Sequence, residues 1–105
     1  MPLLRAKELG GIVDKAQVTH ALCDRVLAEE LELARQRCPT LKSVLYFGSD
    51  AEAGLEARMS AQPDSFDNLA TAATDICLIA FTSGTTGVPK ATLHFHRDLM
   101  AACAC

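Results

Sequence analysis

The sequence contains no tryptophan, and aromatic residues make up only 5% of it. Surfaces that bind single-stranded nucleic acid stack the bases on aromatic side chains, so this scarcity argues against such a surface. Positive charge is also scarce, because 13 acidic residues outnumber 10 basic ones and give a net charge of -3. That balance does not attract phosphate backbones or anionic membranes. Nucleic acid is therefore not an expected partner.

Long apolar runs are absent as well. No run approaches the roughly 20 residues that span a bilayer, and the first turns contain Arg5, Lys7 and Glu8 in place of the apolar segment of a secretory signal. The five cysteines are an odd number without the spacing of a disulfide framework. We expect them to be small core residues of a reduced protein. These features predict a cytoplasmic protein that does not enter the membrane.

Half of the 105 residues are hydrophobic, which is enough for the core of one domain. Apolar residues at helical spacing predict a helix over residues 3–15. The apolar run 18–23 predicts a strand, and Asp24 after it is a suitable cap for an amphipathic helix that ends near Pro39. A second strand is predicted over residues 43–47. Strand, helix and strand over this length predict a βαβ unit with parallel strands.

The acidic residues of the amphipathic helix fall outside its apolar stripe. Glu29, Glu30 and Glu32 are therefore expected to form a solvated face. Asp24 and Asp75 each stand at a strand boundary, where capping accounts for them without any chemistry.

The remainder of the chain predicts one short helix and then a strand, loop, strand and helix. A surface helix is expected within 51–62, and the polar segment 65–74 is expected to be a loop or a brief helical turn. The apolar run 76–80 and the segment 91–95 are predicted strands. A final helix is predicted from about residue 97 to the end.

Residues 81–90, with the sequence FTSGTTGVPK, separate the last two predicted strands. Glycines that adopt positive φ let a polyanion approach the backbone amides. Four hydroxyl groups add further donors, and the lysine supplies a mobile positive charge for terminal phosphates. A triphosphate is the ligand that this composition favours. The expected nucleotide-binding residues are Thr82, Ser83, Gly84, Thr85, Thr86, Gly87 and Lys90.

Two other interpretations of this stretch are less consistent with its residues. The P-loop of nucleotide triphosphatases, counted from Gly84, requires Gly at position 89 and Ser or Thr at position 91, where this chain has Pro89 and Ala91. Pro89 has no N–H to give a phosphate, and Ala91 has no hydroxyl for magnesium. An ordinary hairpin turn has no need for four hydroxyls and a lysine.

The string Thr-Ser-Gly-Thr-Thr-Gly-x-Pro-Lys at 82–90 resembles the glycine-rich loop of the adenylate-forming superfamily, which includes acyl- and aryl-CoA synthetases, peptide-synthetase adenylation domains and luciferases. The flanking segments 75–81 and 94–98 look most like benzoate-CoA and 2-aminobenzoate-CoA ligases. The upstream segments 3–9 and 20–24 are similar to the same subgroup. The resemblance thus extends over the whole chain.

This resemblance implies an α/β fold, namely a partial N-terminal domain in which a βαβ unit precedes the strand, phosphate-binding loop, strand and helix. Residues 1–105 would form an incomplete AMP-binding domain, because the family's later motifs for adenine, ribose and the second catalytic lysine do not occur in this sequence. The remainder of a parent polypeptide is then an expected partner. The alternative is a stand-alone nucleotide-binding module without catalysis.

The resemblance also implies the reaction. The parent enzyme would use ATP and Mg²⁺ to convert a carboxylic acid, with an aromatic one such as benzoate or 2-aminobenzoate favoured, into an acyl adenylate, and coenzyme A would then accept the acyl group. Lys90 would act in catalysis by drawing charge toward the departing pyrophosphate.

Two histidines follow the loop. His94 and His96 alternate with Phe95, so on a strand both imidazoles would face the same side. With Cys103 and Cys105 they offer zinc-ligand chemistry, but on a helix those two cysteines would lie on different faces, and no metal site is predicted. We expect one histidine to line the acyl or nucleotide pocket and the other to pack or face solvent.

Overall fold

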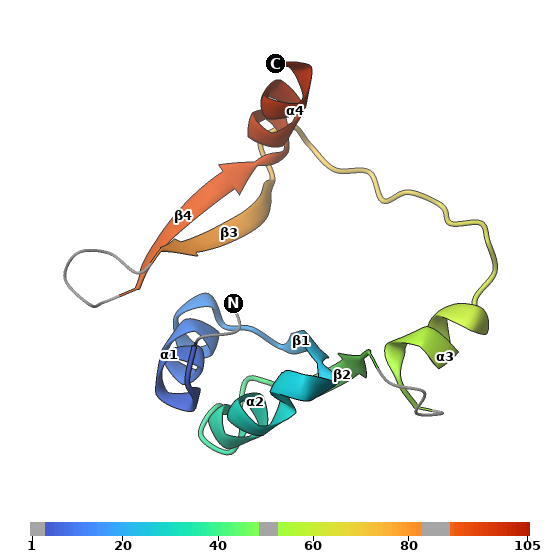
Figure 1. The fold of residues 1–105 in the computed structure, drawn as a ribbon. Helices are drawn as coiled ribbons and strands as arrows, with labels where there is room; N and C mark the ends of the chain where they lie inside the picture. The colour runs from blue at the N-terminus through green and yellow to red at the C-terminus, as the bar shows by residue number, and fades with distance from the viewer. Residues whose placement is uncertain (1–3, 49–52, 83–88) are drawn as a thin grey trace. The chain divides into compact units, whose positions relative to one another are not determined.

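The computed structural model describes residues 4–48, 53–82 and 89–105. The chain divides into two compact units, Met1–Asp64 and Ser65–Cys105. We call them the N-terminal unit and the hairpin unit, and each is described by itself (Figure 1). Helices and strands occur in both units, which confirms the predicted mixed α/β class.

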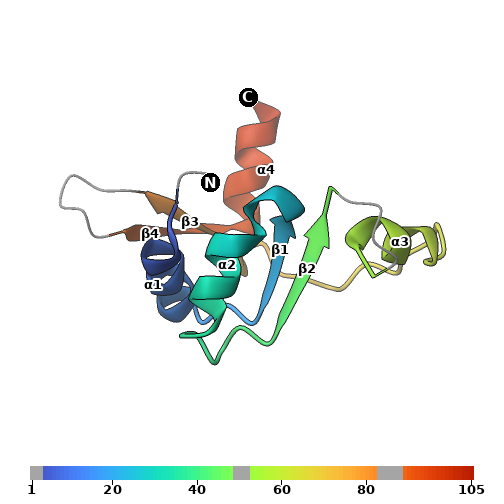
Figure 2. The same cartoon turned by 60° about the horizontal axis from the view of Figure 1, so that its bottom comes forward.

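The N-terminal unit contains the predicted βαβ arrangement. Its strands β1 and β2 are parallel neighbours, as the adjacent arrows in Figure 2 show. Their residues pair without interruption from His20 opposite Ser43 to Asp24 opposite Phe47. The helix between them is preceded by one short 3-10 turn, so the predicted single helix is divided in two. The elements of this part are α1 (Ala6–Ala16), β1 (His20–Asp24), η1 (Arg25–Leu27), α2 (Ala28–Arg35) and β2 (Ser43–Phe47).

Asp24 ends the first strand and begins the turn that follows, as predicted. Its carboxylate accepts a hydrogen bond of 3.0 Å from the backbone N–H of Val26, which satisfies one of the free donors at a helix start. Gly48 ends the second strand with a φ of 74°. A Cβ at that position would lie 3.2 Å from the Asp24 carboxylate, so glycine is suited to this strand end both by conformation and by space.

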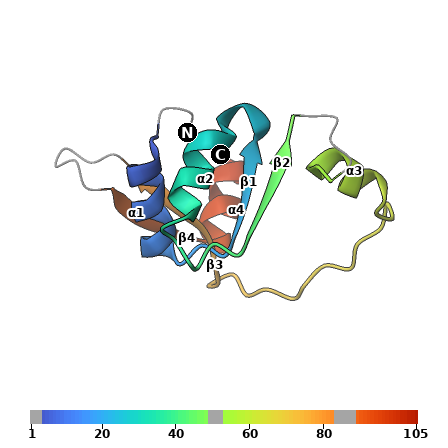
Figure 3. The same cartoon turned by 90° about the horizontal axis from the view of Figure 1, so that it is seen from below.

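A small core lies where α1 and α2 face the two strands. It is formed by Val13, Leu31, Cys38 and Leu41, all buried. The apolar stripe predicted for the amphipathic helix consists of Leu27, Leu31, Ala34 and Cys38. The last three are buried, but Leu27, in the 3-10 turn before α2, is 39% exposed, so the prediction was wrong for this residue. Figure 3 shows α1 and α2 next to each other, in agreement with their contacts. The partly buried residues around this core are Val18, Ala21, Cys23 and Val44.

Glu30 links the two helices of the N-terminal unit. Its carboxylate accepts the backbone N–H of Ala6 at 2.7 Å and the guanidinium of Arg5 at 3.1 Å. A carboxylate at the first turn of α1 also interacts favourably with the helix dipole. The prediction that Glu30 belongs to a solvated face was therefore wrong.

The chain leaves the N-terminal unit through a short helix and an exposed segment. Helix α3 covers Leu55–Ser60, within the predicted 51–62. Residues 65–74 form neither helix nor strand and are exposed throughout, which confirms the predicted loop. Over the described ranges, no helix has the length and apolar character needed to cross a membrane.

The hairpin unit consists of two antiparallel strands and one helix. Strand β3 (Ile76–Thr82) pairs with β4 (Lys90–Phe95), and α4 (His96–Ala104) follows directly. The strands and final helix are those that the sequence predicts, with limits that differ by up to two residues. A shift of register between Ile76 and Leu78 marks a bulge at the start of β3.

The prediction that all five cysteines are core residues was wrong for most of them. All five are free thiols, but only Cys38 is buried, while Cys23 and Cys77 are half-buried. Cys103 and Cys105 are exposed at the end of the chain. The expectation fails for these two because α4, although apolar, has no buried residue in this structure.

Candidate functional site

The two ends of the predicted phosphate-binding stretch are cross-strand neighbours. Thr82 is the last residue of β3, Lys90 is the first of β4, and they are paired in the register of the hairpin. Directly opposite residues of an antiparallel pair have their Cβ atoms about 4.5–5.5 Å apart and point to the same face. Both residues are exposed. The hairpin thus presents a hydroxyl and an ammonium group together at the positions where the loop departs and returns.

The other predicted nucleotide-binding residues lie outside the described residues. They are Ser83, Gly84, Thr85, Thr86 and Gly87. Their assignment to phosphate binding stays a prediction, and the geometry that follows is that of the base of the loop.

Lys90 is free to serve a ligand as far as the described residues show. Their ion pairs join other side chains, and no carboxylate of the described ranges lies within ion-pair distance of the Lys90 ammonium. An exposed lysine without a carboxylate partner keeps its mobility and its charge for an anionic ligand.

The opposite end of the hairpin is fixed by hydrogen bonds around Asp75. Its carboxylate accepts the N–H of Ala72 at 2.8 Å, and its carbonyl accepts the N–H of His96 at 3.1 Å. The N–H of Arg97 reaches the carbonyl of Ala73 at 3.1 Å. Asp75 therefore caps a turn, as predicted, and the start of β3 is tied to the start of α4.

The start of α4 is held in a similar way. The carboxylate of Asp98 accepts the N–H of Phe95 at 2.9 Å. The Arg97 guanidinium lies 5.1 Å from the centre of the Phe95 ring and 3.8 Å from the Asp98 carboxylate. These contacts set the point at which β4 becomes helix.

That transition overturns the prediction that His94 and His96 face the same side of one strand. His94 lies in β4, but His96 is the first residue of α4. Side chains cease to alternate between two faces after Phe95, because the Asp98 carboxylate caps the start of a helix there. The two-residue period of a strand therefore no longer applies to His96. Both imidazoles are half-buried, and whether one lines a ligand pocket stays a prediction.

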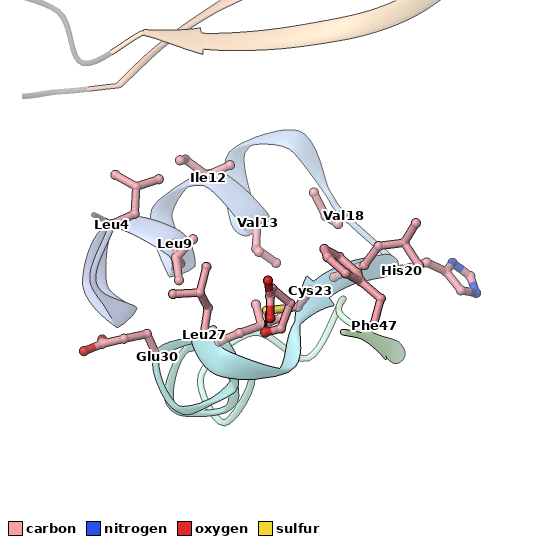
Figure 4. A pocket seen from close by; sticks show the side chains of 14 residues that line it. Leu4, Leu9, Ile12, Val13, Val18, His20, Cys23, Leu27, Glu30 and Phe47 are labelled. Carbon is pink, nitrogen blue, oxygen red and sulfur yellow. Dashed lines mark hydrogen bonds between the residues drawn. The ribbon is translucent and has the colours of Figure 1, made fainter. Parts of the chain in front are cut away.

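A hollow of about 420 Å³ lies in the N-terminal unit, beside α1 and the face of β1 (Figure 4). Most of its lining is apolar, and its polar side chains are those of His20, Asp24 and Glu30. None of the predicted site residues lines this hollow. Its principal apolar residues are Leu9, Ile12, Val13, Val18, Leu27 and Phe47.

A polar cluster around Tyr46 was not predicted from the sequence. The Tyr46 hydroxyl donates a hydrogen bond to Glu32, and the guanidinium of Arg25 lies 5.0 Å from the centre of the Tyr46 ring. Burial, the hydrogen bond to Glu32 and the charge of that carboxylate raise the pKa of Tyr46 to about 12. The Glu32 side chain is 45% exposed, so it keeps its place on the predicted solvated face while it accepts this hydrogen bond. Arg25, Glu32 and Tyr46 belong to three different elements, which only strand pairing and helix packing bring together, so no local sequence pattern indicates the cluster.

Within the ranges that the structure describes, no three His, Cys, Asp or Glu side chains are arranged to hold a metal ion. The described side chains thus offer no cage of their own for Mg²⁺, which needs several oxygen ligands.

Comparison with known proteins identifies the class. The sequence matches the AMP-binding enzyme family over residues 1–105. The chain belongs to this family. The stretch 82–90, which resembles the glycine-rich loop, starts at the last residue of β3 and ends at the first residue of β4.

Curated relatives of the chain are CoA ligases. It is 34% identical to the benzoate–CoA ligase of Thauera aromatica over 64 residues, which are 61% of this chain and 12% of that protein. It is 30% identical to the long-chain-fatty-acid–CoA ligase 2 of Schizosaccharomyces pombe over 102 residues, or 96% of this chain and 14% of the relative. The matches therefore span only 12% and 14% of the lengths of these two relatives.

Solved structures confirm the fold. The anthranilate CoA ligase in complex with anthranoyl-AMP matches 97% of this chain and 20% of its own, with a TM-score of 0.85 and 24% identity. The luciferase-like enzyme of the nonluminescent mealworm Zophobas morio matches 94% of this chain and 24% of its own, with a TM-score of 0.78 and 22% identity. The predicted likeness to the N-terminal domain of adenylate-forming enzymes is thus confirmed at the level of the fold.

Proposed function

We propose that this chain is part of an ATP-dependent acid–CoA ligase and supplies its phosphate-binding loop. The observation that carries the proposal is the register of the hairpin, which sets Thr82 opposite Lys90 at the two ends of the family motif. Membership of the AMP-binding enzyme family and the CoA ligases among its relatives support it. We also propose that the protein is located in the cytoplasm.

In the first half-reaction a carboxylate oxygen of the acid attacks the α-phosphorus of Mg-ATP. The bond to the bridging oxygen breaks, an acyl adenylate forms, and pyrophosphate departs with the electron pair. Lys90 places its ammonium group near the terminal phosphates and offsets the negative charge that develops on the leaving group. The hydroxyls of the motif and the amides of its glycines position the triphosphate.

In the second half-reaction the thiol of coenzyme A attacks the acyl carbon, and AMP departs. The residues proposed here serve the first half, because they bind the phosphates that have left before the thiol reacts. Loss of pyrophosphate also requires the loop to release its ligand after each turnover.

An aromatic acid is the proposed substrate class, with benzoate and 2-aminobenzoate as the first candidates. The names of the benzoate–CoA ligase and the anthranilate CoA ligase support this choice, whereas the fatty-acid ligases among the relatives favour a longer chain. We propose that His94 or His96, both half-buried and a few residues after Lys90 in the sequence, contributes to the acyl or nucleotide pocket.

The test is acid-dependent exchange of pyrophosphate into ATP by a polypeptide that carries this chain within the full length of such a ligase. Lys90→Ala should lower the exchange rate about 100- to 1,000-fold, the usual effect of removing a group that stabilises developing charge. Lys7→Ala, which removes an exposed lysine from α1, is the matched control and should leave the rate unchanged. Normal exchange by the Lys90 variant would remove this residue from its proposed role.

The same assay with benzoate, 2-aminobenzoate and a fatty acid decides the substrate class. Preference for the fatty acid would contradict the aromatic assignment but leave the role of Lys90 in place. ATP binding that is never accompanied by exchange with any acid would instead favour a nucleotide-binding module without catalysis.

A further inference from the structure

The regularly paired part of the hairpin separates polar from apolar side chains. Residues 78–82 of β3 pair with residues 90–94 of β4 without interruption, from Leu78 opposite His94 to Thr82 opposite Lys90. Side chains alternate between the two faces of a strand and paired residues share a face, so every second pair lies on the same side. All polar residues of these two segments fall on one side, which we call the polar face; they are Thr82, Lys90, Thr92 and His94. The opposite face has only apolar residues, namely Ile79, Phe81, Ala91 and Leu93.

The polar face leads away from the proposed phosphate site. Thr82 and Lys90 lie where the loop joins the hairpin, so a ligand whose terminal phosphates lie beside Lys90 can extend over this face only toward Thr92 and His94. Residues rise about 3.4 Å each along an antiparallel strand, which places His94 about 14 Å from Lys90. His94 therefore lies beside a part of the ligand that is distant from its terminal phosphates.

The His94 imidazole is half-buried, and its hydrogen-bonding groups are available to a ligand. Its ring forms no hydrogen bond or ion pair with any residue that the structure describes. A neutral imidazole has one N–H donor and one acceptor, and leaving such groups without a partner in a buried place costs free energy. The backbone of His94 is held in position, because its carbonyl accepts the thiol of Cys77 at 3.4 Å.

His96 does not share the position of His94. It is the first residue of α4, and Phe95 before it pairs with Ile76 beyond the shift of register. The alternation that puts Lys90 and His94 on one face therefore does not extend to His96. The register of the hairpin thus distinguishes between the two histidines.

We propose that His94 donates its N–H to the acyl-phosphate group of the bound acyl adenylate, with the Thr92 hydroxyl as a second donor beside it. The inference rests on the proposed function, in which the terminal phosphates lie at the loop and at Lys90. The acid is joined to the α-phosphate, the phosphate most distant from the terminal one, so the reacting group lies toward the His94 end of the polar face. A donor at this end binds the charged adenylate after pyrophosphate has left.

The experiment measures the binding of a benzoyl sulfamoyl adenosine, a stable analogue of the acyl adenylate without β- and γ-phosphates, by isothermal titration calorimetry. The protein is a polypeptide that carries this chain within the full length of such a ligase. His94→Met removes the N–H and should raise the Kd about tenfold or more, the usual loss for a hydrogen bond to a charged group. His94→Gln has a side chain of similar length with an N–H donor, and should raise the Kd by less than about threefold.

The same pair of substitutions at His96 is the comparison that separates the two histidines. His96→Met and His96→Gln should bind the analogue equally well, because no donor is lost from the polar face. Lys90→Ala should raise the Kd of the analogue by less than about threefold, although it lowers pyrophosphate exchange, because the analogue has no terminal phosphates for the ammonium group to bind.

Thermal unfolding of each variant without ligand identifies one that fails to fold. Thr92→Val keeps the shape of its side chain and loses only the hydroxyl, so it provides a second test and should raise the Kd about threefold to tenfold.

Equal affinities of the two His94 variants would overturn the inference, and so would a difference that occurs at His96 instead. Normal exchange by Lys90→Ala, together with the expected difference at His94, would contradict the role of Lys90 in the proposed function and leave the His94 contact in place. An analogue that does not bind to the wild-type polypeptide would overturn both.

Discussion

The two units of this chain contain similar elements but hold them in different ways. The N-terminal unit surrounds a small apolar core with two helices and two parallel strands. The hairpin unit holds its strands and helix by backbone hydrogen bonds and by caps such as Asp75 and Asp98, without a buried residue in its described part. The proposed phosphate loop therefore belongs to the less stabilised of the two units. A loop that must admit ATP and release pyrophosphate is expected to come from such a region.

The strongest test of this contrast is a pair of leucine truncations. Leu31→Ala in α2 removes a side chain that is 7% exposed and should lower the free energy of unfolding by about 2–5 kcal/mol. Leu78→Ala in β3 removes one that is 44% exposed and should cost less than about 1 kcal/mol, because little new cavity forms. Urea denaturation followed by circular dichroism measures both. Equal costs would mean that Leu78 is buried in solution and that the two units do not differ in this way.

The titration of Tyr46 tests whether the N-terminal unit also buries a polar group. Its pKa is raised from 10.0 to about 12, chiefly by burial and then by Glu32, so the folded state favours the protonated hydroxyl. The stability that this preference contributes is complete below pH 10 and is lost as the pH rises toward 12, because the unfolded chain releases its proton first.

Tyr46 is the single tyrosine of the sequence, so tyrosinate absorbance reports on it alone. The midpoint should lie near pH 12 in the folded chain and near pH 10 in urea. Glu32→Gln should lower the folded midpoint, because it removes the negative charge that raises the pKa. Tyr46→Phe should remove the part of the pH dependence of unfolding that belongs to this residue. A folded midpoint near 10 would show that the cluster around Tyr46 is open to water.

The smallest expected effect lies in the hairpin unit. Asp98→Ala removes the carboxylate that accepts the N–H of Phe95 and should weaken α4 by about 0.5–1 kcal/mol. Amides of α4 should then exchange about two- to fivefold faster. Asp67→Ala, in the exposed segment before β3, is the matched control and should leave their exchange unchanged. A large, global loss of structure in the Asp98 variant would contradict the view that this cap acts locally.

Much of this fold could be predicted because its signals are local. The second strand has the predicted limits, Ser43–Phe47, since an apolar run ends there at a glycine. Asp24 is the predicted cap, and the loop motif lies between two strands as expected. Each of these features depends on residues close together in the sequence, so periodicity and turn chemistry are enough to find it.

The errors concern residues whose partners are distant or whose surroundings are set by a neighbouring element. Glu30 bonds Ala6 across 24 positions of sequence, which a helical pattern alone cannot indicate. His96 does not continue the alternation of the strand, because Asp98, three residues after Phe95, caps the start of a helix there. Cys103 and Cys105 are as apolar in sequence as Cys38, and only packing decides that Cys38 is buried and that they are not.

The sequence alone indicates the class of each segment and predicts phosphate binding by the loop, because hydrophobic period, capping residues and a glycine-rich motif act over short distances. Only the tertiary structure decided that the chain forms two units, that its core lies in the first, and that Tyr46, Glu32 and Arg25 meet. It also decided the register that puts Thr82 opposite Lys90. These outcomes depend on the competition between burial, strand pairing and the solvation of polar groups over the whole chain, which no short stretch of sequence contains.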